Sequence, residues 1–259
     1  MSGTERVLDL HLGGRRLAAA EHDVGGPLVI FCHGFRGERT GPHRTFVRAA
    51  RALASCGVSS LRFDQYGSGD SAGDFLESRF DDWIETVVAL VEQAAGRPVG
   101  LLGQSMGASA AICAAARTWV AATVAWVPDP ELGPYAPHSS GAMEEGGQLV
   151  ADAFWQQACA ADVVGSLRRG SAPSYLVFGT ADEYVSPDDR TALSAATGPP
   201  TASTCSRAGR TPPGRLPRRT SSSAAAPPSS PGTCSESSGP PSGSRRRQRG
   251  RGRRWQCGQ

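Results

Sequence analysis

The chain has 259 residues, enough for one sizeable α/β domain, and its charge is divided between two unlike parts. Residues 1–198 carry 15 arginines and 23 acidic residues, a net charge of −8, whereas residues 199–259 carry 12 arginines and one acid, a net charge of +11. No apolar run approaches the roughly 20 residues that a membrane helix needs, and the first residues lack the basic and apolar regions of a signal peptide. We therefore expect a cytoplasmic protein with no membrane partner.

Short apolar runs alternate with helical periodicity from Val7 to about Thr197. The first run reverses at Gly13–Gly14 and predicts a β-hairpin. Further strands are predicted at 27–32, 58–63, 99–102, 120–127 and 174–178, and helices at 43–56, 81–95, 105–117 and 187–197. Continuously apolar strands that alternate with helices predict an α/β fold with a doubly wound, mostly parallel sheet.

One long connection, at about 128–173, interrupts this alternation. It begins with four prolines and continues with a stretch of helical character, GGQLVADAFWQQACA, at 146–160. Connections of this length in compact domains are usually functional covers or binding loops. We therefore predict one domain over residues 1–198, with a lid inserted at 128–173.

Residues 199–259 differ in composition from the rest of the chain. They contain 10 Pro, 12 Ser and 8 Gly besides the arginines, and their large apolar residues are Leu216 and Trp255. Such a segment cannot bury enough surface to offset its ordering entropy, so we predict a disordered tail. The Arg/Gly run at 244–259 is of a type that binds nucleic acid through phosphates. We do not expect a nucleic-acid partner, because a frame-shifted reading of a GC-rich gene gives this composition without selection.

The sequence Gly103-Gln104-Ser105-Met106-Gly107 has the pattern G-x-S-x-G. It follows a predicted strand and opens a predicted helix, which is the context that makes the pattern informative. Small neighbours allow a serine to occupy a tight strand-to-helix turn, and the helix N-terminus offers N–H groups to a developing oxyanion. Ser105 is therefore the candidate nucleophile, and the alternative is a serine that caps the helix.

Asp182 follows the predicted strand 174–178 and precedes a helix with Ser186 and Pro187 at its start. An acid after the nucleophile fits the chain order Ser…Asp…His of one class of catalytic triad, in which the acid holds the histidine. The alternative is a turn aspartate that makes a local hydrogen bond to the backbone.

Three stretches together resemble the cinnamoyl/feruloyl-esterase-like branch of the serine α/β hydrolases, which overlaps with serine aminopeptidase-like proteins. They are HGFRGERTGPHRTFVRAARALASCGVSSLRFDQYGSGDSAGDF (33–75), LLGQSMGAS (101–109) and FGTADEYVSP (178–187). The resemblance implies an α/β-hydrolase fold and hydrolysis of a small-molecule carboxylic ester. We expect no cofactor and no metal, since the seven cysteines lack the spacing of a zinc site. The resemblance also implies that the lid forms the substrate pocket. Thioesterases and small-peptide hydrolases use the same acyl-enzyme route and remain alternatives.

The resemblance further implies Ser105 as nucleophile, Asp182 as triad acid, and the backbone N–H groups of Phe35 and Met106 as oxyanion hole. His33 is interpreted as a turn residue rather than the base, and the stretch 64–74 as a Gly/Asp/Ser turn. The arginines near the predicted oxyanion loop are interpreted as solvated surface; they are Arg36, Arg39 and Arg44.

One departure from the family is serious: the chain has no histidine after Asp182, where the catalytic base is expected. Three explanations are open. His138 in the lid could act as a substitute base, the protein could be a non-catalytic pseudoenzyme or binding protein, or the reading frame could shift near residue 200. We favour the third, because the shifted codons of 202–211 allow an apolar strand followed by a histidine. On this interpretation the last strand and helix of the fold are missing or replaced, and the chain is weakly active or inactive.

Overall fold

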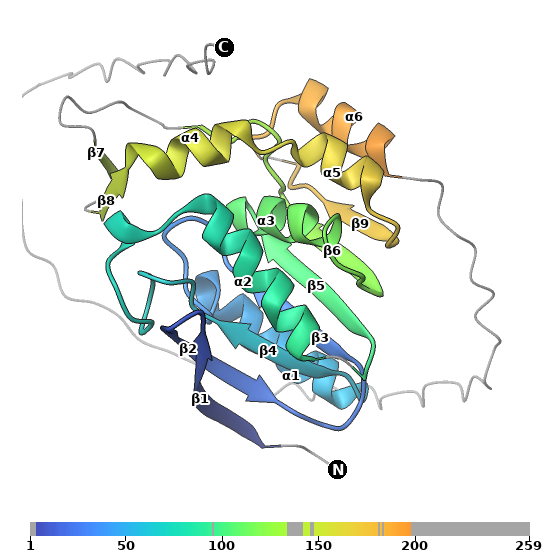
Figure 1. The fold of residues 1–259 in the computed structure, drawn as a ribbon. Helices are drawn as coiled ribbons and strands as arrows, with labels where there is room; N and C mark the ends of the chain where they lie inside the picture. The colour runs from blue at the N-terminus through green and yellow to red at the C-terminus, as the bar shows by residue number, and fades with distance from the viewer. Residues whose placement is uncertain are drawn as a thin grey trace, which may run out of the picture. The chain divides into compact units, whose positions relative to one another are not determined.

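A seven-stranded sheet forms the centre of the computed structural model, which describes residues 4–94, 96–133, 148–180, 182 and 184–197, and only the backbone of 142–145 (Figure 1). The strand order is β1-β2-β4-β3-β5-β6-β9. Their bounds are β1 Glu5–Leu12, β2 Arg15–His22, β3 Leu28–Cys32, β4 Ser59–Phe63, β5 Val99–Gln104, β6 Ala122–Trp126 and β9 Ser174–Val177. The strands from β4 to β9 in this order pair in parallel, while β2 pairs antiparallel with β1 and β4. The prediction of a mostly parallel α/β sheet is confirmed.

The hairpin of β1 and β2 turns at Gly13 and Gly14, as the sequence predicts. Both residues have positive φ, 55° and 77°, which the favoured two-residue hairpin turn requires at both central positions. Alanines at the centre of β2 are buried where this hairpin joins β4.

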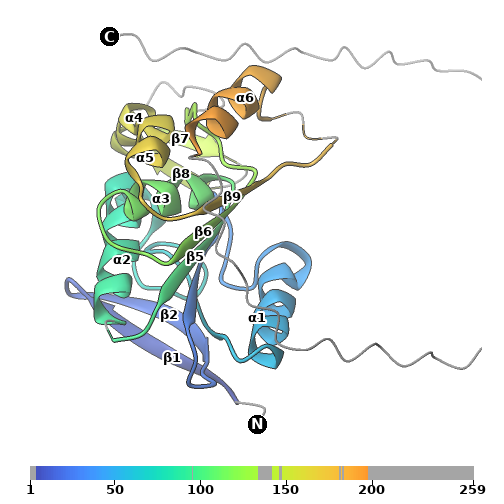
Figure 2. The same ribbon diagram turned by 90° about the vertical axis from the view of Figure 1, so that its right-hand side faces the viewer.

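Helices cover the two faces of the sheet unequally. The helices are α1 Thr45–Ser55, α2 Phe80–Gln93, α3 Met106–Ala115, α4 Asp152–Ala160, α5 Val163–Arg169 and α6 Pro187–Ala196, with 3₁₀ turns at Pro42–Arg44 and Phe75–Glu77. Figure 2 shows α2, α3, α4 and α5 on one side of the sheet and α1 on the other. The main hydrophobic core lies on the α2–α3 side and is centred on buried aromatic side chains, which include Phe75, Phe80, Trp83 and Phe154.

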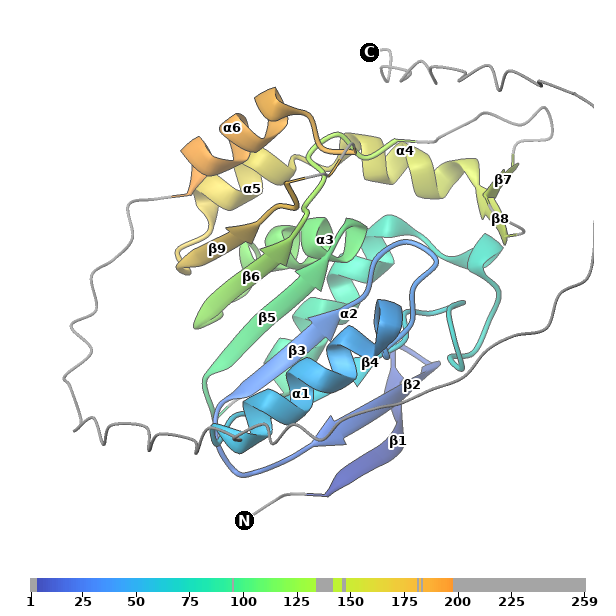
Figure 3. The ribbon, with the colours of Figure 1, turned by 180° about the vertical axis from the view of Figure 1, so that it is seen from behind.

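The opposite face has a smaller core, in which Phe46 and Ala50 of α1 pack on Phe31 and Leu102. In Figure 3, α1 crosses this face over β3 and β4, and no other described helix lies in front of β6 and β9. Tyr175 of β9 is 69% exposed, and among the described residues no strand pairs with the outer edge of β9. This edge is where the sequence predicts a missing last strand and helix.

The connection at 128–173 contains more regular structure than the sequence predicts. Its described part includes the hairpin of β7 (Ala142–Glu145) and β8 (Gln148–Ala151), followed by α4 and α5. The helical interpretation of 146–160 is wrong at its start, because Gln148–Ala151 is a strand in which Leu149 is 52% exposed and Val150 is buried. This alternation is that of a half-buried strand.

Other predictions lie outside the described residues, namely those on His138 and on the tail 199–259. Among the described helices, none has both the length and the apolar character of a membrane span.

Candidate functional site

Ser105 occupies the turn between β5 and α3. Its backbone has φ 53° and ψ −129°, a strained conformation for a residue other than glycine. Its N–H donates to the Trp126 carbonyl at 2.8 Å, and its carbonyl accepts from the Ala108 N–H at 2.8 Å. The residue is exposed, and its side chain makes no capping hydrogen bond to α3. The structure therefore does not support the alternative, a serine whose side chain caps the helix.

The glycines around Ser105 are required by close backbone contacts. A Cβ atom on Gly103 would lie 2.5 Å from the Cα of Ala108, and one on Gly107 would overlap the carbonyl oxygens of Cys32 and His33. These contacts bring the start of α3 against the ends of β3 and β5. Such crevices at the carboxyl ends of neighbouring parallel strands are where α/β sheets bind ligands.

The two residues predicted to supply oxyanion donors are Met106, directly after Ser105, and Phe35, in the loop after β3. Met106 is the first residue of α3, so its N–H has no partner within the helix. Gly34 passes so close that a Cβ there would lie 3.2 Å from the Cβ of Ser105, and the next residue is Phe35. Within the described part of the chain, neither N–H donates a hydrogen bond. Phe35 and Ser105 line the same cavities, and the oxyanion hole formed by the N–H groups of Phe35 and Met106 stays a prediction.

His33 supports the loop after β3, and both of its ring nitrogens are hydrogen-bonded. Its Nε2 accepts the Gln65 N–H at 2.9 Å, so the ring proton is on Nδ1, which donates to the Gly34 carbonyl at 2.8 Å. The side chain is 1% exposed. This agrees with the interpretation of His33 as a turn residue.

The protonation of His33 gives a pH-dependent stability. Burial lowers the pKa of the imidazole below its ordinary value of 6.5, against opposing effects of the Gly34 carbonyl and the Asp64 charge. The unfolded chain therefore takes up this proton near pH 6.5 while the folded chain does not. The stabilisation is complete above that pH and is lost as the pH falls below it.

We expect the free energy of unfolding in urea to fall by about 1 kcal/mol per pH unit below pH 6.5 through this group. The matched variant is His33→Gln, whose amide oxygen can still accept the Gln65 N–H. The free energy of unfolding of His33→Gln should decrease less than that of the parent between about pH 7.5 and about pH 5.5. Equal decreases in the two proteins would contradict the role of His33 in the pH dependence.

A buried ion pair holds the middle of the same loop. Asp64 is fully buried at the end of β4, accepts the backbone N–H of Arg39 at 2.5 Å, and pairs with its guanidinium. Arg39 also pairs with the exposed Asp70 at 2.6 Å. The interpretation of Arg39 as solvated surface is wrong, since its side chain is only 17% exposed. Phe35 therefore lies between two attachments of the loop, at His33 and at Arg39.

Asp182 lies in the loop between β9 and α6, with its side chain 8% exposed. Its carboxylate accepts the Tyr184 N–H at 2.9 Å, the local bond that the turn interpretation anticipates, and also pairs with Arg190 at 3.4 Å. Arg190 further donates to the carbonyl oxygens of Asp182 at 2.6 Å and of Val185 at 3.1 Å. The sequence analysis missed Arg190, which has no local signal beyond its place in the helix.

Two cavities meet at Ser105. One, of about 480 Å³, is lined by Phe35, Arg36, Gln104, Ser105, Val127, Asp129, Asp182, Tyr184 and Val185. The other, of about 370 Å³, lies along the loop from His33 to Pro42 and shares Phe35, Arg36, Gln104 and Ser105 with the first. Of the five non-glycine residues with positive φ in the described chain, three line the larger of these cavities: Arg36, Ser105 and Val127. Such strained residues cluster at functional sites.

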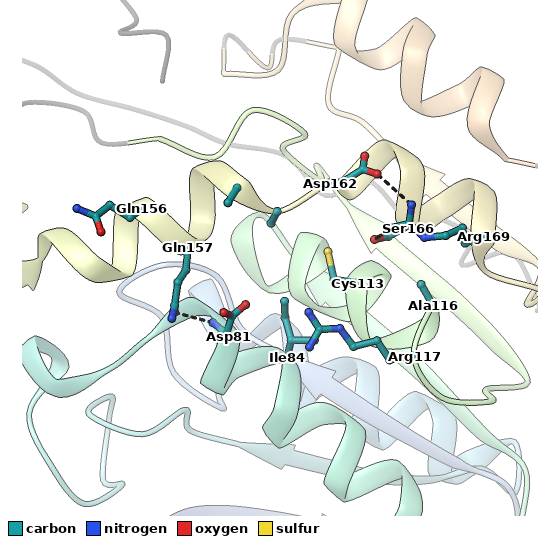
Figure 4. Close-up of a pocket in the computed structure, with 12 residues that line it drawn as sticks. Asp81, Ile84, Cys113, Ala116, Arg117, Gln156, Gln157, Asp162, Ser166 and Arg169 are labelled. Carbon is teal, nitrogen blue, oxygen red and sulfur yellow. Dashed lines mark hydrogen bonds and ion pairs between the residues drawn. The ribbon is translucent and has the colours of Figure 1, made fainter. Parts of the chain in front are cut away.

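A third cavity, of about 570 Å³, lies between α2, α3, α4 and α5 (Figure 4). Its polar side chains are largely paired with one another or with neighbours, such as Arg169 with Asp162 at 3.0 Å. Burial raises the pKa of the Cys113 thiol at its wall, so this thiol is a poor nucleophile. Among the described residues, no cluster of histidine, cysteine or carboxylate side chains is arranged to hold a metal.

Comparisons with known proteins concern the first half of the chain and the fold. The family model for the serine aminopeptidases (S33) matches residues 26–127. The lysophosphatidylserine lipase ABHD12 of Xenopus tropicalis is 34% identical over 92 residues, which is 33% of this chain and 22% of the lipase.

Among solved structures, Est1E of Butyrivibrio proteoclasticus with bound ferulic acid has a TM-score of 0.66 at 24% identity, over 73% of this chain and 85% of that one. The mouse α/β hydrolase domain-containing protein 10 has a TM-score of 0.64 at 21% identity, over 74% of this chain and 85% of that one. The family match covers β3, β4 and β5 and the Ser105 turn, and these structures share the fold. The chain therefore has the α/β-hydrolase fold, and its residues 26–127 match the serine aminopeptidase family model.

Proposed function

We propose that this chain is a serine hydrolase of carboxylic esters with low turnover. The observation that carries the proposal is the exposed Ser105 on a strained turn at the start of α3. The backbone N–H groups of Met106 and Phe35 donate no hydrogen bond within the described chain, and we propose them as its oxyanion donors. Two such donors can stabilise the negative oxygen of a tetrahedral intermediate, and loss of one typically costs about 10²–10³ in turnover. Ser105 would form the acyl-enzyme, and Asp182 would serve as the acid.

Low turnover is expected because no described histidine is free to act on Ser105. His11, His22 and His43 do not line the cavities at Ser105, and both nitrogens of His33 are hydrogen-bonded. Without a base the serine is a weak nucleophile, and loss of a triad member typically costs several orders of magnitude. Similarity to a lysophosphatidylserine lipase and to Est1E with bound ferulic acid supports esters as the substrate class.

The test is hydrolysis of p-nitrophenyl acetate and butyrate, with a feruloyl ester added to the panel. We expect turnover well below about 1 s⁻¹, the lower end of the ordinary enzyme range, and loss of the protein-dependent rate in Ser105→Ala. A rate at or above that range would refute the low-turnover claim. A rate that Ser105→Ala retains in full would refute the hydrolase itself.

A further inference from the structure

Arg36 brings a positive charge to both cavities that meet at Ser105. Among the described residues that line either cavity it is the one arginine, and it is exposed. His33 lines the smaller cavity, but burial lowers the pKa of its imidazole, which is therefore neutral at neutral pH. Within this lining, Arg36 supplies the permanent positive charge, because a guanidinium stays protonated in proteins.

The Arg36 guanidinium has no ion pair with a described carboxylate. Glu38 lines the smaller cavity and Asp129 and Asp182 line the larger one, yet none of the three pairs with it. Arg190, by contrast, is bound to Asp182. The charge of Arg36 is therefore available to a ligand that enters either cavity.

The backbone holds Arg36 in a conformation that favours glycine. The Gly37 N–H donates to the Gly34 carbonyl at 2.9 Å, which closes a turn with Phe35 and Arg36 at its centre. Arg36 has φ 56°, and a positive φ at the third residue of such a turn favours glycine or asparagine. Strained residues of this kind cluster at ligand-binding sites. The position therefore indicates a function for the arginine side chain.

The Phe35 ring supports the Arg36 side chain. The central carbon of the guanidinium lies 5.7 Å from the centre of this ring, within the range of a cation–π contact. The ring packs in turn against Phe75 and Trp155, with centroid distances of 5.4 and 5.1 Å. A ring contact uses none of the N–H donors of the guanidinium, which remain able to bind both oxygens of a carboxylate.

We propose that Arg36 binds a carboxylate carried by the ester that Ser105 attacks, an inference that rests on the proposed function. The guanidinium donates to the two carboxylate oxygens while the ester carbonyl lies at Ser105. Because Arg36 lines both cavities, the acyl side and the alcohol side of the ester are two possible positions for the carboxylate. A neutral ester lacks this contact and binds more weakly.

The experiment compares kcat/KM of the full chain for two matched pairs of esters, with the rates without protein subtracted. The mono-p-nitrophenyl ester of adipic acid carries a carboxylate on the acyl side, and p-acetoxybenzoate carries one on the alcohol side. The neutral partner of each is its methyl ester. At about pH 8 both carboxylates are ionised.

We expect kcat/KM to be about fivefold higher for the acid than for its methyl ester in one of the two pairs, which is the size that an exposed ion pair supports. The pair that shows the preference identifies the side of the ester that Arg36 contacts. The preference should come from a lower KM, and it should weaken at about 1 M salt, which screens exposed charges.

Variants of two arginines test the assignment. Arg36→Gln should bring the ratio of acid to methyl ester close to one, and Arg36→Lys should keep part of the preference because it keeps the charge but not the two-point contact. The matched control is Arg44→Gln. Arg44 is also exposed and has a positive φ of 59°, but it lines neither cavity, so this variant should keep the full preference.

Calorimetric titration of Ser105→Ala with the same four esters measures binding without cleavage. The favoured acid should bind about fivefold more tightly than its methyl ester, and the two should bind equally when Arg36→Gln is added. Equal binding in both pairs, or a preference that Arg36→Gln retains, would overturn this inference even where Ser105-dependent hydrolysis occurs. If the binding preference is present without Ser105-dependent hydrolysis, the proposed function falls and the carboxylate site at Arg36 stands.

Discussion

Gly107→Ala is expected to prevent the chain from folding to its native state. The added methyl group would overlap the carbonyl oxygens of Cys32, the last residue of β3, and of His33, which follows it. These are backbone atoms and cannot turn away as a side chain can. Residue 107 is buried in α3, whose buried residues include further small ones such as Ala108 and Ala111. The clash therefore forces the whole helix away from the sheet.

The expected cost exceeds the 1–3 kcal/mol that is usual for overpacking, and it is a large part of a total stability of about 5–15 kcal/mol. The measurement is soluble yield and thermal unfolding by circular dichroism. Gly100→Ala is the matched control in β5, since a Cβ there would first meet the Ala122 carbonyl oxygen at 3.5 Å, an ordinary contact. A melting temperature of Gly107→Ala within a few degrees of the parent would show that the helix and strand are not in this contact.

Asp64→Ala is expected to lower the free energy of unfolding by about 3–5 kcal/mol, as removal of one partner from a buried ion pair does. The substitution leaves the Arg39 guanidinium, which is 17% exposed, without its buried partner. It also removes the acceptor of the backbone N–H groups of Arg39 and Asp70. Both the loop after β3 and the turn after β4 lose their common attachment.

Asp70→Ala provides the control, because Asp70 pairs with the same guanidinium but its side chain is 74% exposed. Exposed pairs contribute about 1 kcal/mol or less. Urea unfolding of both variants measures the difference. Equal losses in the two variants would mean that the burial of Asp64 does not determine its contribution.

The sheet could be predicted from the sequence because each of its strands has a local signal. Apolar runs bounded by glycine, proline or polar residues mark β3 to β6 and β9, and their bounds lie within about two residues of the prediction. The Ser105 turn could be predicted for the same reason, since its glycines, strand and helix are contiguous. The short strand Gln148–Ala151 was missed because four residues before a helix carry too little periodicity to separate the two.

The supports of the site could not be predicted, because they join residues that are far apart in the chain. Arg39 and Asp64 are 25 residues apart, and an arginine in a glycine-rich stretch gives no sign of burial. Arg190 donates hydrogen bonds to the backbone carbonyl oxygens of Gly179 and Asp182. Because the acceptors are backbone atoms, the side-chain pattern of the sequence does not indicate these bonds. The sequence indicates which charged side chains are able to form ion pairs, and the fold determines which of them lie within contact distance.

Trapping of the acyl-enzyme tests the central claim, that Ser105 is the nucleophile. The full chain is incubated with p-nitrophenyl acetate, and the acetylated residue is located by peptide mapping. The chain contains no lysine, so side-chain amines do not compete for the acetyl group. We predict acetylation of the peptide that contains Ser105, absent from that peptide in Ser105→Ala. Labelling confined to other residues, such as the exposed Cys56, and unchanged by Ser105→Ala would contradict the account.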